Sequence, residues 1–190
     1  MRTQKRAFPK RLTIVLWIIG AAAVLLLGLW QVSKARCFSL VGSVTCRVET
    51  AEPVVALSFD DGPTDRGVKY ANEVLERLGV KGTFFLTGRE AQARPDLVRA
   101  LLTGGHEVAN HSFSHKQMVG SSREIYEQEI ARTHSVLTAA GAEGVNLFRP
   151  PYGKKLIGLP LAVQRQGYRT IMWDVEDPGV PRTRSLTQTR

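Results

Sequence analysis

Two short motifs contain side chains able to bind a metal ion and to move a proton. The stretch "SFDDGP" places Asp60 and Asp61 side by side, and "NHSFSH" places His111 and His115 four residues apart. One helical turn brings such histidines to the same side, so both imidazoles can reach one ion. With a carboxylate they form a two-histidine, one-carboxylate set that leaves positions open for water. Neighbouring side chains of an extended segment point in opposite directions, so one aspartate is predicted to bind metal while the other faces a water.

Each motif also has a simpler interpretation when it is taken alone. Asp, Gly and Pro are common turn residues, so "DDGP" is equally typical of a turn. Two histidines four residues apart are more often incidental than ligating. A third motif, "RPPYG" at residues 149–153, makes the combination more specific than any of its parts.

In this order and at these separations, "SFDDGP", "HSFSH" and "RPPYG" resemble the polysaccharide deacetylases of carbohydrate esterase family four, which have the NodB-like fold. The resemblance covers residues 50–180. It implies an α/β fold, a distorted (β/α) barrel with a divalent metal that is often zinc. It also implies removal of N-acetyl groups from amino-sugar polymers, or of O-acetyl groups from xylan. Cobalt, nickel and iron are alternative metals, because neutral imidazole suits them too.

By position, the resemblance implies that Asp61, His111 and His115 are the metal ligands and that Asp60 is the general base. Arg149 matches the arginine that orients this aspartate, although an ordinary ion pair is the alternative. These roles suit amide hydrolysis, since a divalent ion polarises the carbonyl and lowers the pKa of its water. Of the two adjacent aspartates, Asp61 would then bind the ion and Asp60 would accept the proton.

Two further residues are carried over from the resemblance. Tyr152 matches the residue whose backbone N–H helps to bind the oxyanion, and a packing aromatic is the alternative. Asp174, in "MWDVEDPGVPR", matches the family's fourth motif. Either Asp174 or Asp177 is expected to contact Arg149.

The family's fifth motif carries a histidine that serves as the catalytic acid, whereas no histidine follows His134 here. His106 is interpreted as structural, and His134 as solvated or packed. The chain is therefore expected to be a fragment or a prematurely ended reading frame, with an incomplete barrel that lacks its C-terminal part. The alternative is a genuinely shortened variant that uses a partner or a water molecule as the acid.

The elements that must position these side chains alternate between strand and helix patterns. Apolar or β-rich runs predict strands over 54–59, 82–86, 107–110, 145–148 and 168–175. Helical spacing predicts helices over 68–78, 94–103, 121–140 (capped by Ser121 or Ser122) and 156–166. Short connections between them predict a mostly parallel sheet. Because the carboxyl ends of parallel strands share one rim, the motif residues that follow these strands are expected to converge there.

The formal charge of +9 lies mainly at the two ends of the chain, and residues 53–180 are balanced. A nucleic-acid-binding protein concentrates basic charge on its folded domain, so that class of partner is excluded. Residues 12–33 are free of charge and long enough to cross a bilayer. Basic residues precede this run, which predicts a cytoplasmic N-terminus. The alternative is a signal peptide cleaved at Ser33-Lys34-Ala35.

The chain is thus divided into a cytoplasmic basic tail (1–11), a transmembrane signal-anchor (12–33), a juxtamembrane segment (34–52) and a deacetylase domain (53–190). The domain is expected to be periplasmic or extracellular, and secreted if the anchor is cleaved. Export permits a disulfide between Cys37 and Cys46, and two free thiols are the alternative.

The sequence therefore predicts a single-pass membrane protein that removes N-acetyl groups from a peptidoglycan-like or chitin-like polysaccharide. The first alternative is a catalytically silent, truncated sugar-binding or scaffold protein. A phosphatase is a distant alternative, because the haloacid-dehalogenase loop needs two aspartates separated by one residue and Asp60 and Asp61 are adjacent.

Overall fold

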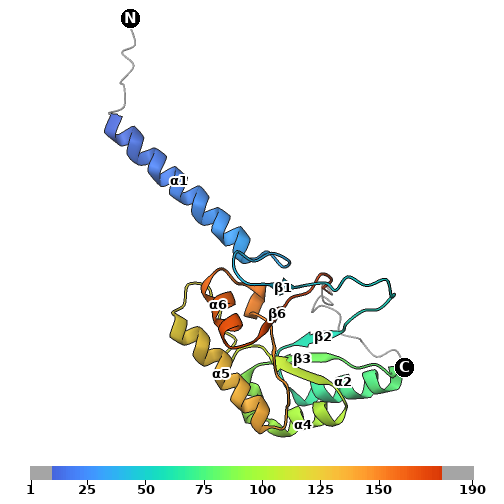
Figure 1. Cartoon of the computed structure of the whole chain (residues 1–190). Coiled ribbons are helices and arrows are strands. Elements are labelled where there is room, and N and C mark those ends of the chain that lie inside the picture. The colour runs from blue at the N-terminus through green and yellow to red at the C-terminus, as the bar shows by residue number, and fades with distance from the viewer. Residues whose placement is uncertain (1–9, 177–190) are drawn as a thin grey trace, which may run out of the picture.

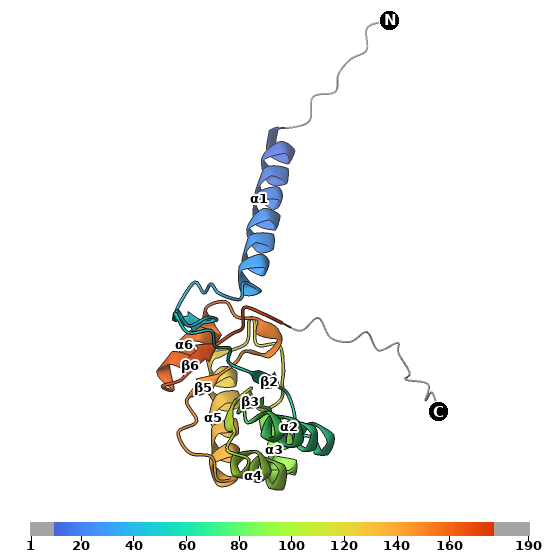
Figure 2. The same cartoon turned by 90° about the vertical axis from the view of Figure 1, so that its right-hand side faces the viewer.

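The computed structural model describes residues 10–176. Helix α1 (Lys10–Ser33) projects away from the rest of the chain, as Figure 1 and Figure 2 both show. Between Arg11 and its last turn the side chains of this helix are mostly apolar on all sides and exposed, and an 18-residue window of it has a mean hydropathy of 2.7. A helix of this kind has no core-facing stripe to bury in the domain, so the domain is held by the other elements.

A six-stranded parallel sheet forms the centre of the domain, in the order β1-β6-β5-β4-β3-β2. Over residues 10–176 the sheet curls without closing, which confirms the predicted incomplete (β/α) barrel. Its strands are β1 (Val44–Thr45), β2 (Ser58–Asp60), β3 (Thr83–Leu86), β4 (Glu107–Asn110), β5 (Leu147–Phe148) and β6 (Arg169–Ile171).

The helices that connect the strands begin and end where local signals place them. The hydroxyl of Thr64 accepts from the N–H of Gly67 at the start of α2, and Gly79 ends that helix with φ 66°. Ser122 caps α5 through the N–H of Ile125. The helices are α2 (Asp65–Leu78), α3 (Gly88–Ala93), α4 (Pro95–Thr103), α5 (Arg123–Ala139) and α6 (Gly158–Arg165), with a 3-10 turn at Pro151–Gly153.

The core lies between the sheet and these helices. Helices α4 and α5 pack on β4, and α6 packs on β6. Leu86 and Phe148 from the strands, and Ile130 and Leu137 from α5, are at most 1% exposed. Each such side chain contributes about 1.5–3 kcal/mol when it is buried. This packing holds the central strands, and hence their carboxyl ends, in fixed positions.

The first predicted strand differs from the structure. The apolar run predicts a strand from residue 54, but Val54 and Val55 are 63% and 86% exposed, and β2 begins only at Ser58. The reason is that β2 lies at an edge of the sheet, with β3 on its inner side. Helix α3, over which no element was predicted, follows β3 directly; its sequence "GREAQA" has no apolar periodicity to reveal it.

The segment between α1 and the predicted domain boundary contributes to the sheet. Strand β1 pairs with β6, with Val44 opposite Thr170 and Thr45 opposite Ile171. Cys37 and Cys46 form a disulfide with a Cα–Cα distance of 5.4 Å. Residues assigned to a juxtamembrane segment thus form one edge of the sheet.

Candidate metal centre

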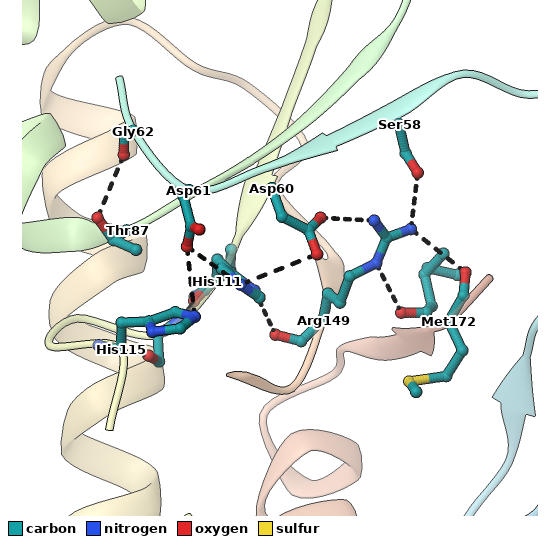
Figure 3. Close-up of polar contacts among 12 residues, drawn as sticks. Ser58, Asp60, Asp61, Gly62, Thr87, His111, His115, Arg149 and Met172 are labelled. Carbon is teal, nitrogen blue, oxygen red and sulfur yellow. Dashed lines mark hydrogen bonds and ion pairs between the residues drawn. The ribbon is translucent and has the colours of Figure 1, made fainter. Parts of the chain in front are cut away.

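The two adjacent aspartates point to different partners because the chain turns sharply between them. Asp60 ends β2, whereas Asp61 and Gly62 have φ values of 70° and 74°. Aspartate adopts this left-handed conformation more readily than most residues. The Gly62 carbonyl accepts from the N–H and hydroxyl of Thr87, at 3.1 and 3.2 Å, which holds the turn (Figure 3). The divergence of the two side chains therefore comes from a turn and not from the alternation of an extended strand.

His111 and His115 meet without a helix, so the helical geometry expected from their spacing is wrong. They lie in the loop after β4, where Ser112 and His115 have φ values of 66° and 53°. The centres of the two rings are 4.9 Å apart. The loop reverses and brings the rings together, an arrangement that a four-residue spacing does not reveal.

Glu129 of α5 holds this loop, and no sequence motif indicated it. Its carboxylate accepts from the N–H groups of Phe113 and Ser114, at 2.9 and 2.8 Å, and from the Ser114 hydroxyl at 2.7 Å. A carboxylate that accepts several such bonds fixes a loop strongly. The only sequence signal is a charged residue on a helix, which is usually solvent-exposed.

Asp61, His111 and His115 form a cluster whose potential ligand atoms all lie within 4.8 Å of one another. Asp61 Oδ1 is 3.7 Å from His111 Nε2 and 3.3 Å from His115 Nε2 (Figure 3). Tetrahedral coordination with bonds of about 2.1 Å separates neighbouring ligand atoms by roughly 3.4 Å. The spacing and the donor types therefore fit a divalent metal ion.

The protonation of His111 also fits a metal ligand. Its Nδ1 is 2.8 Å from the Arg149 carbonyl, which only accepts, so Nδ1 carries the proton and Nε2 presents its lone pair to the cluster. Burial lowers the pKa of His111, despite the opposing effect of nearby Asp60. The neutral form that a metal requires is thereby favoured.

Arg149 holds the second aspartate from behind. Its Nη1 is 2.5 Å from Asp60 Oδ1, and its Nη2 donates to the Ser58 hydroxyl at 2.9 Å. The guanidinium group also donates to the carbonyls of Ile171 and Met172, both at 3.2 Å (Figure 3). Arg149 is 3% exposed, whereas the Asp60 side chain is 33% exposed. Asp60 is thus fixed on one side and open to solvent on the other.

Asp174 lies next to a different arginine. Its carboxylate lies 3.3 Å from Nε of Arg47, while the carboxylate on Arg149 within the described residues is that of Asp60. Asp174 pairs with Arg47 because β1 brings that arginine next to the end of β6, so the prediction that Asp174 or Asp177 contacts Arg149 stays a prediction. The alternative residue, Asp177, lies outside the described part of the chain.

Tyr152 lies beside the cluster on an unusual backbone. Its φ is 57°, inside the 3-10 turn that the Gly153 N–H closes by donating to the Pro150 carbonyl. Its ring is 4.7 Å from that of His115, and the residue is 62% exposed. The tight turn presents this stretch of backbone at the rim that carries the aspartates and histidines.

These observations define a class of protein, an α/β protein with a curled parallel sheet and a candidate metal centre at the carboxyl ends of its strands. The chain belongs to the polysaccharide deacetylase family, whose sequence profile matches residues 47–171.

Individual relatives agree with this family. The chain is 32% identical over 146 residues to a peptidoglycan-N-acetylglucosamine deacetylase of Bacillus cereus, which covers 73% of this chain and 68% of that protein. It is 32% identical to a chitooligosaccharide deacetylase of Sinorhizobium fredii, over 68% of this chain and 61% of that protein. The match spans only 44% of a second peptidoglycan-N-acetylglucosamine deacetylase of Bacillus cereus.

A solved structure shows the same fold. The family 4 carbohydrate esterase from Streptomyces lividans, in complex with acetate, superposes with a TM-score of 0.61 at 36% identity. The match covers 64% of this chain and 62% of that one.

Proposed function

We propose that this chain hydrolyses N-acetyl groups of an amino-sugar polysaccharide of the peptidoglycan or chitooligosaccharide kind. One observation carries the proposal: Asp61, His111 and His115 converge while Asp60, held by Arg149, lies beside them. The names of the relatives support the substrate class.

In this proposal Asp61, His111 and His115 hold a divalent cation, with zinc favoured by the two imidazoles and one carboxylate. Cobalt, nickel and iron suit the same ligands. When bound, such a cation supplies a Lewis acid for the amide carbonyl and for the attacking water.

The remaining residues handle the proton and the developing charge. Asp60 accepts the proton of the attacking water, and its exposed side gives the water access. Arg149 keeps that carboxylate in one orientation through the contact at 2.5 Å. The backbone N–H of Tyr152 donates to the oxyanion of the tetrahedral species. The C–N bond then breaks to give acetate and the amine, which takes up the proton that Asp60 removed from the water.

A second candidate function is binding of the polysaccharide without turnover. It is favoured by the roles of the four histidines in the sequence. His111 and His115 belong to the cluster, His106 accepts from the Gly82 N–H, and His134 contacts the Tyr168 hydroxyl at 2.6 Å. None of these four histidines is therefore placed to protonate the leaving amine.

We further propose that α1 is a single-pass anchor with the domain outside the cytoplasm. Its 24 residues, its hydropathy and the exposure of its side chains support a membrane span. Basic residues before it favour a cytoplasmic N-terminus. The disulfide between Cys37 and Cys46 supports an oxidising compartment for the domain.

Acetate release separates the two candidate functions. The full chain is incubated with peptidoglycan fragments or chitooligosaccharides, with and without zinc, beside Asp60→Asn, His111→Ala and the control Glu107→Gln. Glu107 is an exposed carboxylate bonded to the Thr83 hydroxyl at the other end of β4. The deacetylase proposal expects zinc-dependent acetate from the wild type and the control only.

Zinc titration by calorimetry completes the test. Loss of His111 is expected to weaken binding about 100-fold or more, whereas Asp60→Asn should retain it. Zinc and sugar binding without acetate release would establish the second candidate. Absence of zinc binding by the wild type would refute the metal-dependent mechanism.

A further inference from the structure

A buried lysine outside the candidate metal centre connects the apolar helix to the domain. Lys155 is 1% exposed, and its ammonium group donates to the carbonyls of Ala35 at 2.5 Å and Arg36 at 3.5 Å. Its own backbone N–H donates to the Ser33 carbonyl at 2.9 Å. A buried ammonium group is costly unless it is hydrogen-bonded, so these carbonyls are required partners.

The carbonyls belong to the end of α1 and the residues that follow it, here called the junction (residues 33–36). Ser33 is 1% exposed, and its hydroxyl donates to the Trp30 carbonyl at 2.7 Å. The Trp30 ring lies 4.8 Å from the ammonium group of Lys34 and 4.5 Å from that of Lys154. The last turn of the helix therefore packs directly on the chain around Lys155.

Further contacts hold the junction in the same position. Arg36 forms an ion pair with Glu176 at 2.5 Å, and its guanidinium group lies 5.3 Å from the Trp173 ring. The disulfide from Cys37 begins one residue later. Exposed pairs of this kind contribute little individually, so Lys155 is the buried and most consequential contact.

The chain on the other side of the contact is the loop of residues 149–155. Arg149 fixes the start of this loop by binding Asp60, and Lys155 fixes its end by binding the junction. Tyr152, with its left-handed φ of 57°, lies between these two attachments. The position of the Tyr152 N–H therefore depends on both ends of the loop.

We propose that Lys155 is a positioning residue that ties the loop carrying Tyr152 to the end of the membrane-anchoring helix. The junction is then a structural part of the active domain. Cleavage after Ala35 would remove the Ala35 and Ser33 carbonyls and leave the buried ammonium group with a single distant acceptor. The role of the loop in turnover rests on the proposed function, whereas the attachment itself does not.

Hydrogen exchange of the full chain in detergent tests the attachment without any activity. Lys155→Met is compared with the wild type, with Lys155→Gln, which keeps a donor, and with Lys116→Met at an exposed lysine. Lys155→Met should speed exchange in residues 33–36 and 149–155 by about 10- to 100-fold, the equivalent of one hydrogen bond to a charged group.

The outcomes are distinct. Lys155→Gln should give an intermediate rate, and exchange in β3 and β4 should not change. Unchanged exchange in Lys155→Met would overturn the attachment. A uniform rise over β3 and β4 would also overturn it, because Lys155 would then support the whole core and not the junction.

Kinetics test the positioning role. If acetate release is observed, Lys155→Met should lower kcat about tenfold or more and change zinc affinity by less, since the metal ligands lie on other loops and only the His115 ring contacts Tyr152. Lys116→Met should leave both unchanged. Altered exchange with an unchanged kcat would retain the attachment but overturn the positioning role. Absence of acetate release from the wild type would count against the proposed function and not against the exchange result.

Discussion

Replacing Arg149 with methionine removes the central polar contact of the candidate site while preserving most of the side chain's volume. The change deletes donated hydrogen bonds to Asp60, Ser58 and the carbonyls of Ile171 and Met172. Removal of one partner of a buried ion pair costs about 3–5 kcal/mol. Because the Asp60 side chain is 33% exposed, water compensates part of this loss. We therefore expect destabilisation of about 2–4 kcal/mol.

For a domain of this size the change corresponds to a melting temperature lower by roughly 5–15 °C. Thermal and urea unfolding are followed by circular dichroism in the presence of a chelator, so that metal binding does not contribute. Arg132→Met is the matched control, because Arg132 is exposed and stacks on Phe113 at 3.5 Å. The control should cost less than about 1 kcal/mol. Equal losses for the two variants would refute the view that Arg149 is a buried anchor for Asp60.

Three other predictions concern stability. Burial lowers the pKa of His106 below its ordinary 6.5, so the unfolded chain binds more protons and stability falls as the pH drops through about 6.5. His106→Asn should flatten this slope by up to about 1.4 kcal/mol per pH unit in urea unfolding, and an unchanged slope would contradict the assignment. The double variant Cys37→Ser/Cys46→Ser should lower the free energy of unfolding by about 2–3 kcal/mol, because the disulfide closes a loop of sequence separation 9. An unchanged free energy in denaturant unfolding would exclude a disulfide in the native chain. Gly88→Ala should cost about 1–3 kcal/mol, because its Cβ would lie 2.5 Å from the Phe113 ring; a neutral effect in thermal melts would show that the ring moves freely.

The sequence patterns predicted the fold class and the meeting of distant motifs for the same physical reason. Parallel strands with short connections place all their carboxyl ends at one rim, so Asp61 and the histidines converge whatever the details of each loop. Strand β4 matches its predicted range of 107–110, and Ser122 caps α5 as one of the two proposed residues.

The local geometry of the site could not be predicted from sequence patterns, because tertiary contacts determine it. The loop that carries His111 and His115 takes left-handed φ values that Glu129, on a distant helix, helps to hold. Similarly, the partner of Asp174 is Arg47, which depends on the pairing of a two-residue strand with β6. A strand of that length has no periodicity to recognise.

The position of β1 beside β6 has a consequence for the timing of folding. These strands are neighbours in the sheet, although they lie near opposite ends of the described chain. A polypeptide that crosses a membrane from its N-terminus delivers β1 first and must wait for β6 to arrive last. Until then one edge of the sheet lacks its strand pairing, and contacts between segments so far apart in the sequence form slowly. In the proposed anchored topology, β1 would be exported first and stay unpaired until β6 follows, so this intermediate would be open to chaperones outside the cytoplasm.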